Sequence, residues 1–290
     1  EGFAEWQDNY AVFSEGETVL FRDHEPSQNL QFASATTAGS LRFTNTETYS
    51  FSGSDVALSG KLNVESGKLV LNNKLTAADI STEGGEIVVA ADGELELSGN
   101  RSGKVAVNGV SGTGTLSLSL TQSYNNDLAV NADFDGTTHV KSGYFTLNQN
   151  STYGKKLRMG DGVNFRLLSS TTIDADIELD GSSRFFPEDN NKLTINGEVT
   201  GTSGTWIRRG KGDVVFNGKV NLSAFDFEET GTTTHFNGTA TIGNLILDTD
   251  TATLGGTGKL SVGNFNLAGG KSVTIDGLSI VESSARTRSW

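Results

Sequence analysis

Short runs in which apolar and polar residues alternate recur along almost the whole chain. Residues 94–97 read Glu-Leu-Glu-Leu, and residues 116–120 read Leu-Ser-Leu-Ser-Leu. In the longest run, residues 173–180, four apolar residues alternate with four acidic ones. A period of two residues is typical of a β-strand with one buried face. Because Gly, Asn, Asp or Ser bound these short runs, the pattern predicts an all-β protein of many short strands.

A short unit of an apolar residue followed by Asn-Gly recurs along the chain. It occurs at residues 107–109, 195–197, 216–218 and 236–238, and the last two copies are 20 residues apart. A spacing in the low twenties is typical of one turn of a β-solenoid, in which each turn stacks on the one before. Asn-Gly is also the strongest signal for a two-residue hairpin, so stacked antiparallel hairpins or a β-sandwich remain as alternatives.

The composition favours the solenoid over the sandwich. Gly, Ser, Thr and Asn make up 122 of the 290 residues, which suits a narrow apolar interior behind a polar exterior. Aromatic residues crowd near the start, at Phe3, Trp6, Tyr10, Phe13 and Phe21. We therefore predict an N-terminal cap over residues 1–50 and solenoid repeats over residues 51–290. About 240 residues at about 22 per turn would make about 11 turns.

Charge and cysteine content narrow the function classes. The net charge is −13 with a pI near 4.7, which argues against a nucleic-acid partner because phosphate would be repelled. No run approaches the roughly 18 apolar residues of a membrane helix, so we predict no membrane span in this chain. There is no Cys, which excludes disulfides and thiolate metal ligands. Cys-free strands rich in Ser, Thr, Asn and Gly suit a protein that is secreted or on a bacterial cell surface.

One segment carries a family resemblance. Residues 206–218 read Trp-Ile-Arg-Arg-Gly-Lys-Gly-Asp-Val-Val-Phe-Asn-Gly, and residues 255–260 read Gly-Gly-Thr-Gly-Lys-Leu. The first segment resembles the autotransporter-associated β-strand repeat in the placing of Gly210, Gly212 and Gly218, and the second resembles an ending common in such passengers. The sequence match is good over residues 200–280. Residues 50–200 match only in the general character of their sequence. It implies an autotransporter-like passenger folded as a right-handed parallel β-helix, and it implies no catalytic residues.

Two groups of residues are candidates for acid–base chemistry. Asp23, His24 and Glu25 belong to the densest reactive cluster, although a solvated turn before Pro26 is the favoured explanation. Asp174 and Asp176 would lie on one strand face about 7 Å apart, within the range that glycosidases use. A solvated outer face is the plainer explanation of this pair.

Metal and cofactor signals are weak. Carboxylate pairs can bind Ca²⁺, but no calcium-loop motif is present and the three His are far apart, so we predict no metal and no cofactor. Gly210 to Gly212 leads into a predicted strand, which argues against a phosphate-binding loop.

A third candidate is a ligand-binding spot at Trp206, Arg208 and Arg209. The indole could stack on a sugar, and the guanidinium groups could pair with a sialic acid or a sulfate. The alternative is that Trp206 fills the interior while both Arg side chains are solvated at the rim.

These observations predict a non-catalytic adhesin or binding module for glycans or a host glycoprotein such as mucin. The alternative is a secreted hydrolase of mucin-type glycoprotein, either a glycoside hydrolase or an atypical aspartic-protease-like enzyme that uses a carboxylate pair. A purely structural stalk is the third possibility.

Overall fold

The computed structural model describes residues 16–22, 28–99, 105–121, 126–130, 134–147, 152–267 and 269–281. Strands dominate these residues, no helix occurs among them, and the strands pair in parallel. The fold is a parallel β-solenoid of about 12 turns, consistent with a right-handed parallel β-helix. The stacked-hairpin and β-sandwich alternatives are wrong, because hairpins and sandwiches of this kind need antiparallel neighbours.

The chain divides into two compact units. The first holds residues 1–101, 106–121 and 130–139, and the second holds residues 102–105, 122–129 and 140–290. Three strands include residues of both units: β13 (Val105–Val107), β16 (Asn126–Val130) and β17 (Thr137–Ser142).

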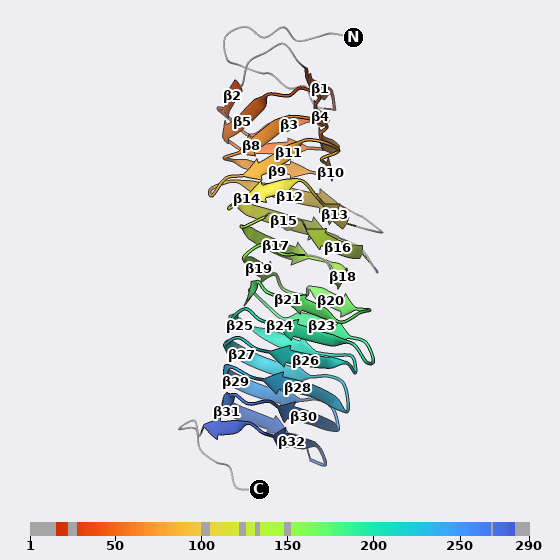
Figure 1. The fold of residues 1–290 in the computed structure, drawn as a ribbon, viewed down its shortest axis with the longest axis vertical. Coiled ribbons are helices and arrows are strands. Elements are labelled where there is room, and N and C mark those ends of the chain that lie inside the picture. Colours follow the sequence, from red (N-terminus) through yellow and green to blue (C-terminus); the bar gives the residue numbers. More distant parts are fainter. Residues whose placement is uncertain are drawn as a thin grey trace. The chain divides into compact units, whose positions relative to one another are not determined.

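Three stacks of parallel strands build the first unit (Figure 1). One stack is β1 (Thr18–Phe21), β4 (Ser40–Phe43), β7 (Lys61–Val64) and β10 (Asp79–Ser81). The second is β2 (Gln28–Phe32), β5 (Thr48–Gly53), β8 (Lys68–Leu71), β11 (Glu86–Val89) and β14 (Val110–Gly112). The third is β3 (Thr36–Ala38), β6 (Val56–Leu58), β9 (Lys74–Ala77), β12 (Glu94–Gly99) and β15 (Thr115–Leu120).

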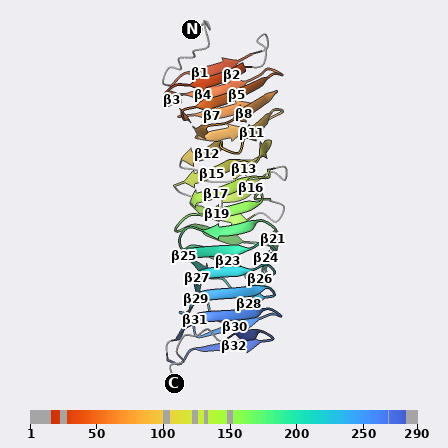
Figure 2. The ribbon, with the colours of Figure 1, turned by 90° about the vertical axis from the view of Figure 1, so that its left-hand side faces the viewer.

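In the second unit, one stack consists of six short strands that follow one another in Figure 2: β21 (Thr171–Ile173), β24 (Lys192–Ile195), β26 (Asp213–Phe216), β28 (Thr232–Phe236), β30 (Thr251–Gly255) and β32 (Ser272–Asp276). Two further sets of short strands are β18 (Tyr144–Leu147), β20 (Asn164–Leu167) and β23 (Ser183–Pro187), and β19 (Lys156–Met159) with β22 (Asp176–Leu179). The remaining strands are β25 (Val199–Arg208), β27 (Val220–Phe227), β29 (Thr239–Leu247), β31 (Lys259–Leu267) and β33 (Ser279–Val281).

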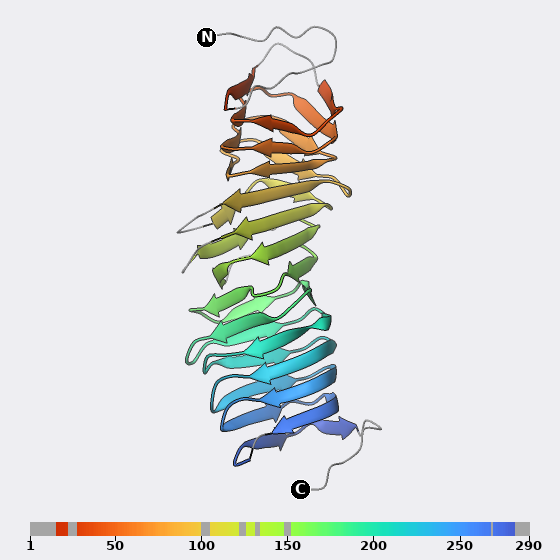
Figure 3. The same cartoon turned by 180° about the vertical axis from the view of Figure 1, so that it is seen from behind.

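The long strand β25 joins the two sets of short strands. Its first residues pair with β22 and its last residues pair with β23, with a bulge between Gly201 and Thr205. Figure 3 shows the parallel strands of this unit from behind, coloured green to blue.

The parallel register places like residues of successive turns on one another. In the first unit Leu95 pairs with Leu116 and Leu97 with Leu118, and these side chains are almost fully buried. Burying a side chain of this size contributes about 1.5–3 kcal/mol, so the columns of apolar residues hold the turns together.

An aromatic column runs through the second unit. Phe145, Phe165, Phe185 and Trp206 follow one another, with centroid distances of 6.0, 5.6 and 3.8 Å, and only the last two rings are stacked face to face.

The stacking of turns begins inside the region predicted as a cap. β1 pairs with β4 from Thr18 to Phe21, and the rings of Phe21 and Phe43 stack at 4.3 Å. Phe21 is therefore an interior residue of a regular turn. The other aromatic residues assigned to the cap, Phe3, Trp6, Tyr10 and Phe13, lie outside the described residues.

The predicted strand over residues 173–180 is two strands. β21 ends at Ile173 and β22 begins at Asp176, so the chain turns a corner at Asp174 and Ala175. The alternation of exposed and buried residues continues through the corner, with Ala175 buried between two exposed Asp. The alternation therefore predicted the buried face correctly, but it carries no information about the change of direction.

Candidate functional site

The recurring Asn-Gly unit forms a corner of the second unit, and we call it the Asn–Gly corner: Asp174, Asn196–Gly197, Asn217–Gly218 and Asn237–Gly238. Asn237 Nδ2 donates to Asn217 Oδ1 at 2.8 Å, and Asn217 Nδ2 donates to Asn196 Oδ1 at 2.8 Å. Asn196 Nδ2 in turn donates to Asp174 Oδ1 at 2.6 Å. The amides form a ladder of the kind seen in stacked parallel strands, and Asp174 ends it.

The glycine after each Asn is required because the turns approach closely. A Cβ at Gly218 would lie 2.1 Å from the carbonyl oxygen of Gly197, and one at Gly238 would lie 2.4 Å from that of Gly218. No side chain fits at either position without moving the backbone. The repeat that suggested hairpins therefore marks close contact between turns.

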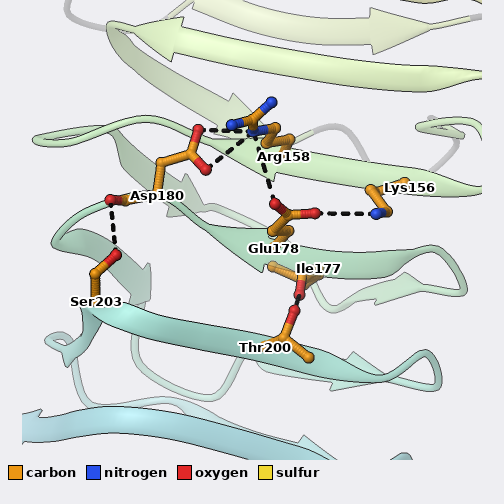
Figure 4. Close-up of polar contacts among 7 residues, drawn as sticks. All are labelled: Lys156, Arg158, Ile177, Glu178, Asp180, Thr200 and Ser203. Atoms are coloured by element: carbon orange, nitrogen blue, oxygen red, sulfur yellow. Dashed lines mark hydrogen bonds and ion pairs between the residues drawn. The ribbon is translucent and has the colours of Figure 1, made fainter.

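A second polar region is the charged face, formed by Lys156 and Arg158 on β19 with Asp176, Glu178 and Asp180 on and after β22. Figure 4 shows these side chains except that of Asp176. Lys156 Nζ lies 2.9 Å from Glu178 Oε2, and Arg158 Nε lies 2.8 Å from Asp180 Oδ2. Asp176 Oδ1 accepts a hydrogen bond from the N–H of Glu198 at 2.8 Å. The charged side chains of this face therefore form ion pairs and hydrogen bonds with residues of neighbouring turns.

The predicted carboxylate pair does not form a free catalytic pair. Asp174 and Asp176 flank the corner, and each accepts a hydrogen bond from the following turn. The assumption of one continuous strand was wrong, so the spacing of about 7 Å has no basis. The other candidate cluster, Asp23, His24 and Glu25, lies outside the described residues.

Trp206 and Arg208 are buried, which contradicts a role in contacting a ligand. The indole of Trp206 stacks on Phe185 with the planes 2° apart, and it meets Phe216 edge-on at 5.0 Å. Both residues occupy inward positions of β25, where the side-chain alternation places them in the core. The prediction that Trp206 fills the interior is confirmed, and the prediction that Arg208 is solvated is wrong.

The guanidinium of Arg208 holds the loop of residues 209–212 from inside. Its nitrogens donate to the backbone carbonyl oxygens of Arg209, Gly210 and Gly212. Burial lowers the pKa of Arg208 to about 10, while Asp213 and Glu229 act in the opposite direction. The group is still charged at neutral pH, and charge-assisted hydrogen bonds to carbonyls compensate part of its desolvation.

Arg209 points outward and packs over one aromatic ring. Its Cζ lies 5.5 Å from the centroid of Phe186, which is within the range of a cation–π contact. Phe186 lies 5.9 Å from Tyr144, and both rings are partly exposed. We call Tyr144, Phe186 and Arg209 the Phe186 patch. Sequence reasoning missed Phe186, although two successive Phe in a strand already require that one of them faces outward.

One further carboxyl group has a pKa that differs from its ordinary value. The pKa of Asp226 is raised to about 6, mainly by burial, and the neighbouring Asp248 and Glu228 act in the same direction. Its Oδ1 atom is buried without a hydrogen-bond partner. This carboxyl can therefore hold a proton in weakly acidic solution, a property that the sequence run Phe225-Asp226-Phe227 does not reveal.

Comparison with known proteins gives no match to a family model, to a curated protein or to a solved structure. The resemblance to the autotransporter-associated repeat therefore stays a prediction from the sequence. Within the described ranges, no three His, Cys, Asp or Glu side chains are grouped so that they could hold a metal ion. In the same part of the chain, no helix has the length and apolar character to cross a membrane.

Proposed function

We propose that this chain is a non-catalytic binding module of a secreted or surface-displayed bacterial protein, and that it recognises glycans, including those of a host glycoprotein such as mucin. The observation that supports this most is the Phe186 patch, where two aromatic rings and a guanidinium lie together on the outer surface. Most outward positions on neighbouring turns carry small polar or paired charged side chains instead.

The chemistry of the patch suits a sugar. Partly exposed aromatic rings provide flat apolar surface for the C–H face of a pyranose ring, and a guanidinium provides several donors for its oxygens. The two aromatic rings of the patch lie on the strands β18 and β23, whose backbones are fixed by parallel pairing through β20. Such a preorganised site binds with little ordering of the protein.

The hydrolase alternative has no comparable support. Asp174 and Asp176 are used in hydrogen bonds between turns. A binding surface needs no proton transfer, so a glycan could bind and leave unchanged.

The test is a binding screen on mucin and on an immobilised set of free glycans, with product analysis of the same samples. We expect binding without released fragments, and we expect Phe186→Ala to weaken it at least about tenfold, which corresponds to about 1.4 kcal/mol. Phe265→Ala is the matched control, because Phe265 is also an exposed Phe, at 40% of its surface, and lies on β31 outside the patch.

Three results would contradict the proposal. Binding that is absent from every sample excludes a glycan-binding module. Fragments released from mucin would favour the hydrolase. Equal losses in Phe186→Ala and Phe265→Ala would remove the patch from the binding surface.

A further inference from the structure

The loop of residues 209–212 lies directly against the Phe186 patch. A Cβ at Gly210 would lie 2.4 Å from the carbonyl oxygen of Pro187 and 3.3 Å from the carbonyl carbon of Phe186. The N–H of Arg209 donates to Phe185 O, and that of Gly212 donates to Pro187 O. The loop is therefore fastened to β23, the strand that carries Phe186, and it forms one continuous surface with the patch.

The inside of the loop is fixed by the buried guanidinium of Arg208. Three of the loop's carbonyl groups point inward to accept hydrogen bonds from it. Gly210 has a φ of 78°, a left-handed backbone conformation that favours glycine. The N–H groups of Gly210 and Lys211 have no hydrogen-bond partner within the part of the chain that the structure describes. Because these carbonyl oxygens face the guanidinium, their negative ends point away from the outer side of the loop.

Two exposed cations stand on this loop. Arg209 and Lys211 make no ion pair with any described residue. Their neighbours on the same surface are paired: Arg166 lies 2.8 Å from Glu188, and Arg184 lies 3.4 Å from Glu228. Arg209 and Lys211 are two residues apart, so two exposed cations without an ion pair lie on one loop of a chain whose net charge is −13.

We propose that the loop of residues 209–212 binds the anionic group of an acidic sugar, a carboxylate or a sulfate ester, while the ring of that sugar packs on Phe186 and Tyr144. This inference rests on the proposed glycan-binding function and names its ligand class. Arg209 presents a planar fork of donors that fits a carboxylate or sulfate bidentately, and Lys211 adds a second charge. The acidic remainder of the surface is screened beyond about 8 Å at physiological salt, so contact charges decide the preference.

The arrangement also assigns different roles to the three cations. Arg209 and Lys211 would touch the ligand, whereas Arg208 is a positioning residue that shapes the loop from the interior.

The experiment uses the whole chain and matched glycans, each in a neutral, a sialylated and a sulfated form, with titration calorimetry on the best binders. We expect at least tenfold tighter binding of one acidic form than of its neutral parent, and weakening of this preference as salt rises from 50 to 500 mM. Lys211→Gln should remove most of the preference while leaving the neutral form bound as before. Arg209→Gln should remove most of the preference and also weaken the neutral form, because Arg209 belongs to the Phe186 patch. Lys259→Gln, which removes an exposed cation elsewhere, is the control and should change nothing.

The possible results distinguish the acidic-sugar inference from the glycan-binding function on which it rests. Equal binding of neutral and acidic forms that still depends on Phe186 overturns the acidic-sugar inference and leaves the glycan-binding function standing. No binding to any form overturns both. An acidic preference that Lys259→Gln lowers as much as Arg209→Gln would show that overall charge, and not the loop, selects the ligand. The sialylated and sulfated arms distinguish the carboxylate from the sulfate.

Discussion

The Asn–Gly corner and the Phe186 patch lie in the same unit. The polar groups of the corner bond to one another, whereas those of the patch remain open to a ligand. In the corner, Asn217 finds another Asn in the turn on either side, and the amides bond to one another. In the patch, Phe186 pairs in register with Arg166, and Arg209 packs over it from a loop. In a parallel solenoid, a residue type that repeats at the same position lies beside a like residue in the next turn, and their polar groups bond to each other. A residue that does not repeat meets unlike neighbours, and its groups stay available for a ligand.

The largest effect should come from the interior beneath the patch. Trp206→Ala removes a fully buried indole that stacks on Phe185, so the free energy of unfolding should fall by about 3–5 kcal/mol. Chemical denaturation followed by circular dichroism measures this loss. Arg209→Ala, three residues away but exposed, should change stability by no more than about 0.5 kcal/mol. Similar small effects of both variants would mean that Trp206 is not part of the core.

The corner offers the next largest effect. Gly218→Ala places a Cβ 2.1 Å from the carbonyl oxygen of Gly197, and the backbone shift should cost about 1–3 kcal/mol. Gly269→Ala is the matched control, because no atom lies within 4 Å of its added Cβ, and it should be neutral or slightly stabilising. Thermal unfolding of the two variants gives the comparison. If Gly218→Ala were as stable as Gly269→Ala, the close approach of turns would not explain the Asn-Gly repeat.

Asp226 is a polar residue that does not repeat in the neighbouring turns, and its effect on stability can be measured. In register it pairs with Ile207 on one side and Ile246 on the other, and its Oδ1 has no hydrogen-bond partner. Burial raises the pKa of Asp226 to about 6, so the folded state holds the proton more tightly than the unfolded state does. Its contribution to stability is therefore present below pH 4 and is lost as pH rises through 6.

We expect Asp226→Asn to raise the free energy of unfolding by about 1 kcal/mol at pH 7, a value reduced for the exposed half of the group, and to change it little at pH 4. Unfolding curves from pH 4 to pH 8 measure the difference. A gain that is the same at both pH values would exclude the carboxyl as its source.

Much of the fold follows from the sequence, because alternation and a spacing near 20 residues together require short strands that stack. The corners do not follow, since the alternation of buried and exposed residues continues through Asp174 and Ala175. The outward position of Phe186 is already implied by its neighbour Phe185. The burial of Arg208 is not, because the three carbonyl groups that bind it come from a loop whose shape depends on close contact with Pro187.

The smallest effect should come from the charged face, where unlike charges repeat between turns. Glu178→Gln weakens the ion pairs to Lys156 and Arg158, whose side chains are about half exposed, so stability should fall by no more than about 1 kcal/mol, and the loss should disappear at 1 M NaCl. Glycan binding should be unchanged, because the charged side chains of this face form ion pairs with one another. Ser261→Ala, at an outward position of β31 without a charge, controls for the substitution itself. A clear loss of glycan binding in Glu178→Gln would reverse the comparison, since the face with paired charges would then be the one that meets the ligand.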